Sequence, residues 1–183
     1  MLKRILCIPD SFKGTLSSSQ VIQTIKEEFK EFLPDTQIIG IEAADGGDGT
    51  VEAFLSTLGG QKMTAIVNGP RFKKMDAYYG ITPDKVAIIE MCVCAGMDLV
   101  KGLADPRTTS TYGVGELMIA AWEQGCRKII VGLGDSCTND GGCGVAAALG
   151  IHFLDKEEKP FIPTGGTLID IDKIDISEAH PLL

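Results

Sequence analysis

The sequence is poor in the residues that most metal centres and nucleophilic active sites require, because only two of its 183 residues are histidine. Its six cysteines include no Cys-x-x-Cys pair and no spacing typical of a zinc site. It also lacks a Gly-x-x-x-x-Gly-Lys-[Ser/Thr] P-loop, and no serine lies in a Gly-x-Ser-x-Gly motif. These absences argue against a His/Cys metal centre, a P-loop nucleotide site and a hydrolase triad.

Basic charge, aromatic residues and long apolar runs are scarce as well. The formal net charge is −8, aromatics make up 6%, and no basic stripe interleaves with them, so nucleic acid is an unexpected partner. No apolar run approaches the roughly 20 residues of a membrane span. The apolar run at the N-terminus is too short for a signal peptide. We therefore expect a cytoplasmic protein with reduced cysteines and no membrane partner.

Glycine, in contrast, is abundant, at 22 of 183 residues. The densest stretch is Ala-Asp-Gly-Gly-Asp-Gly-Thr at residues 44–50, which lies between an apolar run and a helical pattern. Its glycines allow the backbone to approach a ligand closely, and its two aspartates add metal-binding or general-base capacity. The stretch is equally compatible with a phosphate and Mg²⁺ site and with a plain strand-to-helix turn.

Apolar runs alternate with helical patterns along most of the chain, which predicts an α/β fold with a mostly parallel, Rossmann- or flavodoxin-like sheet. A capping box, Ser17-x-x-Gln20, begins the first helix, and Pro34 follows its end. Between residues 62 and 91, three strand-like runs joined by short turns predict an antiparallel meander. Residues 1–60 are expected to form the first part of the α/β domain. Residues 61–183 are expected to hold the meander and a second, incomplete α/β segment that becomes loop-rich after Asp155.

Three polar loops directly follow predicted strands, at residues 10–15, 45–49 and 135–142. If the strands are parallel, these loops share one sheet edge and form one candidate site from Lys13 and several aspartates. Each loop has a simpler interpretation: a solvated Asp–Lys turn at residues 10–15, and a helix cap instead of an anion-binding nest at residues 138–142. Lysine, aspartates and glycine amides without histidine suit phosphoryl transfer, which depends mainly on positioning and electrostatics.

Four segments taken together resemble the bacterial glycerate kinase family (type 1), at residues 9–15, 44–50, 111–117 and 132–144. Two further stretches, 88–91 and 163–166, match in order and spacing, so the resemblance covers the chain from Met1 to about Leu183. The resemblance implies two α/β domains and ATP- and Mg²⁺-dependent phosphorylation of D-glycerate, with 2-phosphoglycerate favoured over 3-phosphoglycerate. Two alternatives stay open: a truncated or split non-catalytic half that binds a ligand or partner, and a kinase for another small hydroxy acid.

Residue roles are inferred from the segments that carry this resemblance. Asp45 or Asp140 is expected to accept the proton of the glycerate hydroxyl, with Lys13 assisting at the phosphate. Mg²⁺ is assigned to Asp48 and Asp140. The nucleotide is assigned to Gly46, Gly47, Thr138, Asn139, Gly141 and Gly142, and the substrate to Asp10, Ser11, Arg71, Arg107 and Thr111.

The sequence departs from the family pattern in two ways. Asp135 and Cys137 stand where the family loop has glycine and alanine, and an added carboxylate repels phosphate unless it binds Mg²⁺ or points away. Family members are also roughly twice as long, and their second half carries further characteristic aspartates. That C-terminal half, or a second copy of the chain, is therefore an open candidate partner.

Overall fold

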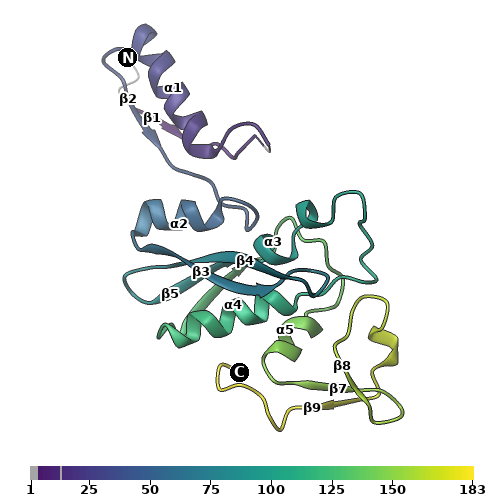
Figure 1. Cartoon of the computed structure of the whole chain (residues 1–183). Helices are drawn as coiled ribbons and strands as arrows, with labels where there is room; N and C mark the ends of the chain where they lie inside the picture. The colour runs from purple at the N-terminus through teal and green to yellow at the C-terminus, as the bar shows by residue number, and fades with distance from the viewer. Residues whose placement is uncertain (1–3, 13) are drawn as a thin grey trace. The chain divides into compact units, whose positions relative to one another are not determined.

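The structure, a computed structural model, describes residues 4–12 and 14–183. The chain forms two compact units, Met1–Asp45 and Gly46–Leu183 (Figure 1). This boundary lies ahead of the predicted division at residue 60, and the division into family domains stays a prediction. Within the described residues, no helix is long and apolar enough to cross a membrane.

The first unit contains a parallel pair of strands and one helix. Strand β1 (Arg4–Cys7) pairs in parallel with β2 (Gln37–Gly40), and α1 (Ser18–Phe32) connects them. The capping box is confirmed, because the Ser17 hydroxyl accepts from the Gln20 amide at 3.2 Å while the Ser17 amide donates to Gln20 Oε1 at 2.8 Å. The helix stops two residues before Pro34, which cannot supply a helical N–H.

The second unit is built on a four-stranded sheet in the order β3-β4-β5-β6. Strands β3 (Gln61–Asn68), β4 (Lys74–Ile81) and β5 (Val86–Glu90) form the predicted antiparallel meander, which is thereby confirmed. Strand β6 (Lys128–Gly132) then adds in parallel to β5. The α/β fold class is confirmed, with parallel pairing between β1 and β2 and between β5 and β6, but the four-stranded sheet is mixed where a mostly parallel sheet was expected.

Two helices cover opposite faces of this sheet (Figure 1). Helix α4 (Tyr112–Glu123) packs its apolar stripe on Tyr79, Ile81 and Ile89, and this cluster is the core of the unit. Successive side chains of a strand point to opposite faces, so Gly80 faces the other way and lies against Val51 of α2 (Thr50–Leu58). By the same alternation, Glu90 is on the face of α2.

The segment after β5 and the C-terminal region contain short elements that the sequence patterns did not predict. Helix α3 (Cys92–Ala95) and the 3₁₀ turn η1 (Met97–Val100) follow β5. Helix α5 (Cys143–Ala148) overlaps a small-residue helix predicted at residues 145–149. It precedes an antiparallel sheet in the order β8-β7-β9, where the chain beyond Asp155 was expected to be loop-rich. The bounds are β7 (His152–Leu154), β8 (Pro160–Phe161), η2 (Leu168–Asp170) and β9 (Lys173–Asp175).

Candidate functional site

The glycine turn that precedes α2 lies directly against the loop that follows β6. The Gly46 carbonyl accepts a hydrogen bond from the Gly134 amide at 2.9 Å. A Cβ atom on Gly132 would clash with that same carbonyl, so the close approach of the two backbones requires glycine there. Gly46 itself has φ 92°, a left-handed conformation that glycine adopts without strain. The two loops are therefore joined through backbone.

This junction brings Asp48 and Asp135 together. The Asp48 amide donates to Asp135 Oδ2 at 3.4 Å. Asp135 has φ 57°, which explains why the family pattern has glycine at this position. Burial, followed by the charges of Glu90, Asp48 and Asp135, raises the pKa of Cys92 to about 12, so these three carboxylates act on one thiol.

Mg²⁺ fits the chemistry of this carboxylate pair. Protein-bound Mg²⁺ commonly takes one or two carboxylates and completes its shell with water and substrate phosphates. Among residues 4–12 and 14–183, no group of three His, Cys, Asp or Glu side chains is placed to enclose a metal. The donor set therefore suits a metal shared with a phosphorylated ligand and does not suit a site closed by protein alone.

Glu90 is a buried carboxylate at the end of β5 that no sequence-derived site assignment included. It is 0% exposed, and its Oε1 accepts from the Val51 amide at 2.5 Å. The Tyr78 hydroxyl donates to its Oε2 at 3.2 Å. Burial raises the pKa of Glu90, while the hydrogen bond from Val51 partly opposes the shift. The sequence signal was a single carboxylate inside the apolar run of residues 88–91.

Asp140 is only 1% exposed and accepts hydrogen bonds from two directions. From the segment before α4, the Thr111 amide and hydroxyl donate to Oδ2 at 2.7 Å and 2.9 Å, and the Ser110 hydroxyl lies 3.3 Å away. From its own loop, the Gly142 and Gly144 amides donate at 3.1 Å and 3.2 Å. Asp140 thus fastens residues 110–111 to the N-terminus of α5.

The Thr111 hydroxyl is part of the same network. It accepts from the Val145 amide at 3.1 Å while it donates to Asp140. A Cβ atom on Gly144 would clash with the Ser110 hydroxyl and with Asp140 Oδ2, so the close contact requires glycine there. Next to this buried hydrogen-bond network, Asn139 and Gly141 are exposed and Thr138 is half-buried. In the loop predicted to bind the nucleotide, Asp140 and the Gly142 amide are therefore hydrogen-bonded within the protein, whereas Asn139 and Gly141 are exposed to solvent.

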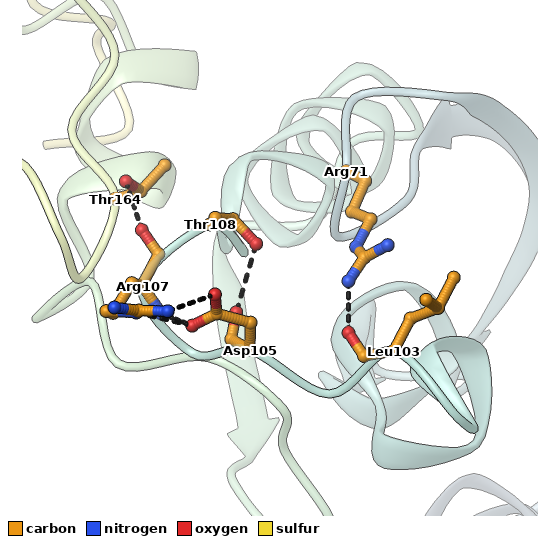
Figure 2. A network of polar contacts seen from close by, with 6 residues as sticks. All are labelled: Arg71, Leu103, Asp105, Arg107, Thr108 and Thr164. Atoms are coloured by element: carbon orange, nitrogen blue, oxygen red, sulfur yellow. Dashed lines mark hydrogen bonds and ion pairs between the residues drawn. The ribbon is translucent and has the colours of Figure 1, made fainter.

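The two predicted substrate arginines lie on neighbouring loops and are both exposed (Figure 2). Arg71 donates to the Leu103 carbonyl. Arg107 forms a bidentate pair with Asp105, in which both nitrogen–oxygen distances are 2.9 Å, and this pair holds the pKa of Asp105 below its usual range. The Arg107 carbonyl accepts from the Thr164 hydroxyl at 2.7 Å, so the 163–166 stretch contacts this loop.

The remaining predicted site residues belong to the first unit. Asp10 is exposed and its Oδ1 accepts from the Ser11 amide at 2.7 Å. Asp45 is exposed at the end of that unit. Lys13 lies outside the described residues. The expectation that these residues share one sheet edge with the loop after β6 stays a prediction.

Comparison with known proteins identifies the family. The family model described as "Glycerate kinase family" matches residues 5–183. The chain belongs to the glycerate kinase family. Glycerate 2-kinase of Escherichia coli (strain K12) is 42% identical over 182 residues, which are 98% of this chain and 48% of that protein. A glycerate kinase of Halalkalibacterium halodurans is 38% identical with the same coverage.

A solved crystal structure has a similar fold. It is that of a candidate glycerate kinase 2 from Salmonella typhimurium LT2, with a TM-score of 0.82 and 36% identity over 98% of this glycerate kinase family chain and 48% of the other. The chain spans about half the length of the curated relatives it matches. The resemblance inferred from the four motifs is thereby confirmed.

Proposed function

We propose that this chain carries part of an ATP- and Mg²⁺-dependent kinase site that phosphorylates D-glycerate, with 2-phosphoglycerate as the favoured product. The observation that supports this proposal most strongly is the family match, which runs through all four motifs from residue 5 to residue 183. Membership of the family supports a kinase, which is a phosphotransferase with an alcohol acceptor. The nucleotide, the metal, the substrate and a cytoplasmic location are our own extension.

The geometry favours Asp45 over Asp140 as the acceptor of the hydroxyl proton. Asp140 is buried and its two oxygens already receive hydrogen bonds from Thr111, Gly142 and Gly144. Asp45 is exposed and lies five residues after the end of β2 (Gln37–Gly40) in the first unit. A general base must reach the proton of a bound substrate, so an exposed carboxylate meets the requirement better.

Asp48 and Asp135 are the residues that would hold Mg²⁺. Both lie where the glycine turn meets the loop after β6. Mg²⁺ supplies charge neutralisation at the transferring phosphoryl group, which is the main requirement of this chemistry. This arrangement gives Asp135 a role despite its departure from the family pattern, because a carboxylate repels phosphate only when no cation lies between them.

Phosphate contacts are assigned to Lys13 and to the backbone of Gly46, Gly47 and Gly141, with Thr138 and Asn139 beside them. We exclude the Gly142 amide from this set because it donates to Asp140. For the substrate carboxylate we favour Arg71, because the guanidinium of Arg107 is already paired with Asp105. Asp10 and Ser11 remain proposed substrate contacts, while the Thr111 hydroxyl is occupied by Asp140.

A coupled assay for ADP release with D-glycerate, ATP and Mg²⁺ tests the proposal. We expect turnover that requires all three components and that falls at least a hundredfold in Asp45→Asn. The matched control is Asp98→Asn, because Asp98 is an exposed carboxylate paired with Lys101 on η1. Absence of turnover, both alone and with the C-terminal half of the E. coli relative added, would reject the kinase assignment.

A second function is motivated by the length of the chain, which is about half that of its relatives. In this alternative the chain binds nucleotide or glycerate without transferring phosphate. Titration calorimetry that shows binding in the absence of turnover would favour it, whereas loss of turnover in Asp45→Asn would rule it out. A kinase for another hydroxy acid would be recognised by turnover on a substrate panel in which D-glycerate is a poor substrate.

A further inference from the structure

Helix α2 begins without a capping side chain of its own. Its N-cap residue is Gly49, which has φ 92° and no side chain to accept from the first free amides. Most helices fill this position with serine, threonine or aspartate. Here the Val51 amide instead donates to Glu90 Oε1 at 2.5 Å, from a strand that lies 39 residues further along the chain.

Glu90 is a costly residue to bury, which makes this contact informative. A carboxylate that is 0% exposed is stable in the folded protein only when hydrogen bonds replace its water. The Val51 amide and the Tyr78 hydroxyl supply two such bonds. Its other charged neighbours are Asp48 and Glu52, both acidic, so charge attraction to them cannot explain its presence.

A continuous set of hydrogen bonds links Glu90 to the glycine turn. Thr50, next to Val51, donates from its hydroxyl to the Gly47 carbonyl at 2.7 Å. The Gly46 carbonyl in turn accepts from the Gly134 amide at 2.9 Å. Because Asp48 lies between these contacts, its position depends on where the first turn of α2 is held.

We propose that Glu90 is a positioning residue that fixes the turn at residues 46–49, and with it Asp48, by holding the Val51 amide at the N-terminus of α2. The part of this inference that concerns catalysis rests on the proposed function. Glu90 also places an anion at the positive end of α2, where a phosphate would otherwise be attracted. The turn at residues 46–49 therefore contributes to the site through Asp48 and its backbone geometry. The N-terminus of α2 is already occupied by the Glu90 carboxylate.

Amide hydrogen exchange on the full chain tests the positioning role without any reference to activity. In Glu90→Ala we expect the amides of residues 47–52 to exchange about tenfold faster or more, because a hydrogen bond to a charged acceptor is lost. The matched control is Glu116→Ala, which removes a carboxylate that accepts from the Asn68 amide at 2.5 Å on the α4 side of the sheet. In that control, residues 47–52 should keep their exchange rates.

Two further variants guard against general unfolding. Glu90→Gln retains an acceptor for Val51, and Tyr78→Phe leaves the Glu90–Val51 contact in place, so both should protect residues 47–52 better than Glu90→Ala does. Unchanged exchange at residues 47–52 in Glu90→Ala would overturn the proposal. A uniform increase across all strands would also overturn it, because Glu90 would then support overall stability alone.

Kinetics separates failure of this inference from failure of the proposed function. If the chain turns over D-glycerate, Glu90→Ala should lower kcat at least tenfold with little change in the KM for D-glycerate, because Asp48 is displaced and the substrate contacts are not. Glu90→Gln retains the acceptor for the Val51 amide and should lower kcat less than Glu90→Ala does. If the wild-type chain is inactive but the exchange result is as expected, the kinase assignment fails and the positioning role stands. An active chain with an unchanged kcat in Glu90→Ala would reject the catalytic part of the inference.

Discussion

Replacement of Asp140 by asparagine should cost the protein a large part of its stability, because five hydrogen-bond donors converge on this carboxylate. They are the Thr111 amide and hydroxyl, the Ser110 hydroxyl and the amides of Gly142 and Gly144, at distances from 2.7 Å to 3.3 Å. Asparagine keeps the shape but replaces one oxygen with an NH₂ group. That group would face N–H and O–H donors, and it cannot accept from the amides.

The magnitude follows from the number of buried donors left without an acceptor. Hydrogen bonds to a charged group contribute about 1.5–3 kcal/mol each, and a buried donor left unpaired costs about 1–3 kcal/mol. Asp140 is 1% exposed, so water cannot replace the lost oxygen without rearrangement. If the retained oxygen takes the place of Oδ2, the NH₂ group replaces Oδ1; the hydroxyls can rotate to new partners, but the Gly142 amide, which donates to Oδ1, cannot and faces the NH₂ group. We therefore expect Asp140→Asn to lower the free energy of unfolding by about 3 kcal/mol.

Urea unfolding, followed by circular dichroism and by the fluorescence of the single Trp122, measures this change. The midpoint should fall while the slope with denaturant is maintained, which shows that stability changed and the unfolded state did not. Asp98→Asn is the control, since this carboxylate is exposed, and its midpoint should match that of the wild type. An Asp140→Asn midpoint equal to that of the wild type would refute the view that Asp140 fastens residues 110–111 to α5.

Three further predictions concern the turn and the loop after β6. First, burial raises the pKa of Glu90, so the stability this group contributes is present below its unfolded pKa and is lost as pH rises through the higher folded value. Glu90→Gln lacks this titration, so urea unfolding should show its free energy of unfolding, relative to that of the wild type, increasing from acid to neutral pH. The nearby Asp48, Glu52, Tyr78 and Cys92 are present in both proteins. A difference between the two proteins that does not change with pH would contradict this prediction. Second, Gly132→Ala should destabilise the protein by about 1–3 kcal/mol in thermal unfolding, because its Cβ atom would clash with the Gly46 carbonyl. Gly125→Ala controls for Gly132→Ala, since a Cβ there meets open space and only its φ of 87° opposes the change; equal losses at the two sites would argue against the close approach. Third, Cys92, with a pKa raised to about 12, should react slowly with iodoacetamide at neutral pH in the folded protein and rapidly once it is unfolded, as mass spectrometry can follow; equal rates would exclude a half-buried, neutral thiol.

Local chemistry made much of the fold predictable from the sequence. The Ser17 and Gln20 pair marked the start of α1 because the capping contacts form between residues three apart. The meander was predictable because Gly69-Pro70 and Pro83-Asp84 interrupt apolar runs of strand length. The strands β7, β8 and β9 were not, because segments of two or three residues are too short to show a period of two.

The candidate site was predictable as a set of loops, whereas the partners of its side chains were not. The sequence pointed to Asp140 as a polar loop residue, but its burial depends on Thr111, which lies 29 residues earlier. The sequence pattern assigned Thr111 to the substrate, although its amide and hydroxyl are donors of this network. Glu90 was noticed as an isolated carboxylate, but the alternation that turns it toward α2 and the bare N-cap at Gly49 become visible only in the packed sheet.

The central claim, that this chain transfers a phosphoryl group to D-glycerate, is tested most directly by ³¹P NMR of the reaction mixture. After incubation of the chain with D-glycerate, ATP and Mg²⁺, we predict a new phosphomonoester resonance that grows as ADP forms. Without proton decoupling it should be a doublet, because the phosphate of 2-phosphoglycerate is coupled to the single proton on C2. A triplet would indicate phosphorylation of the CH₂ oxygen and 3-phosphoglycerate instead. If no phosphomonoester resonance appears, with or without the C-terminal half of the E. coli relative, the claim is contradicted.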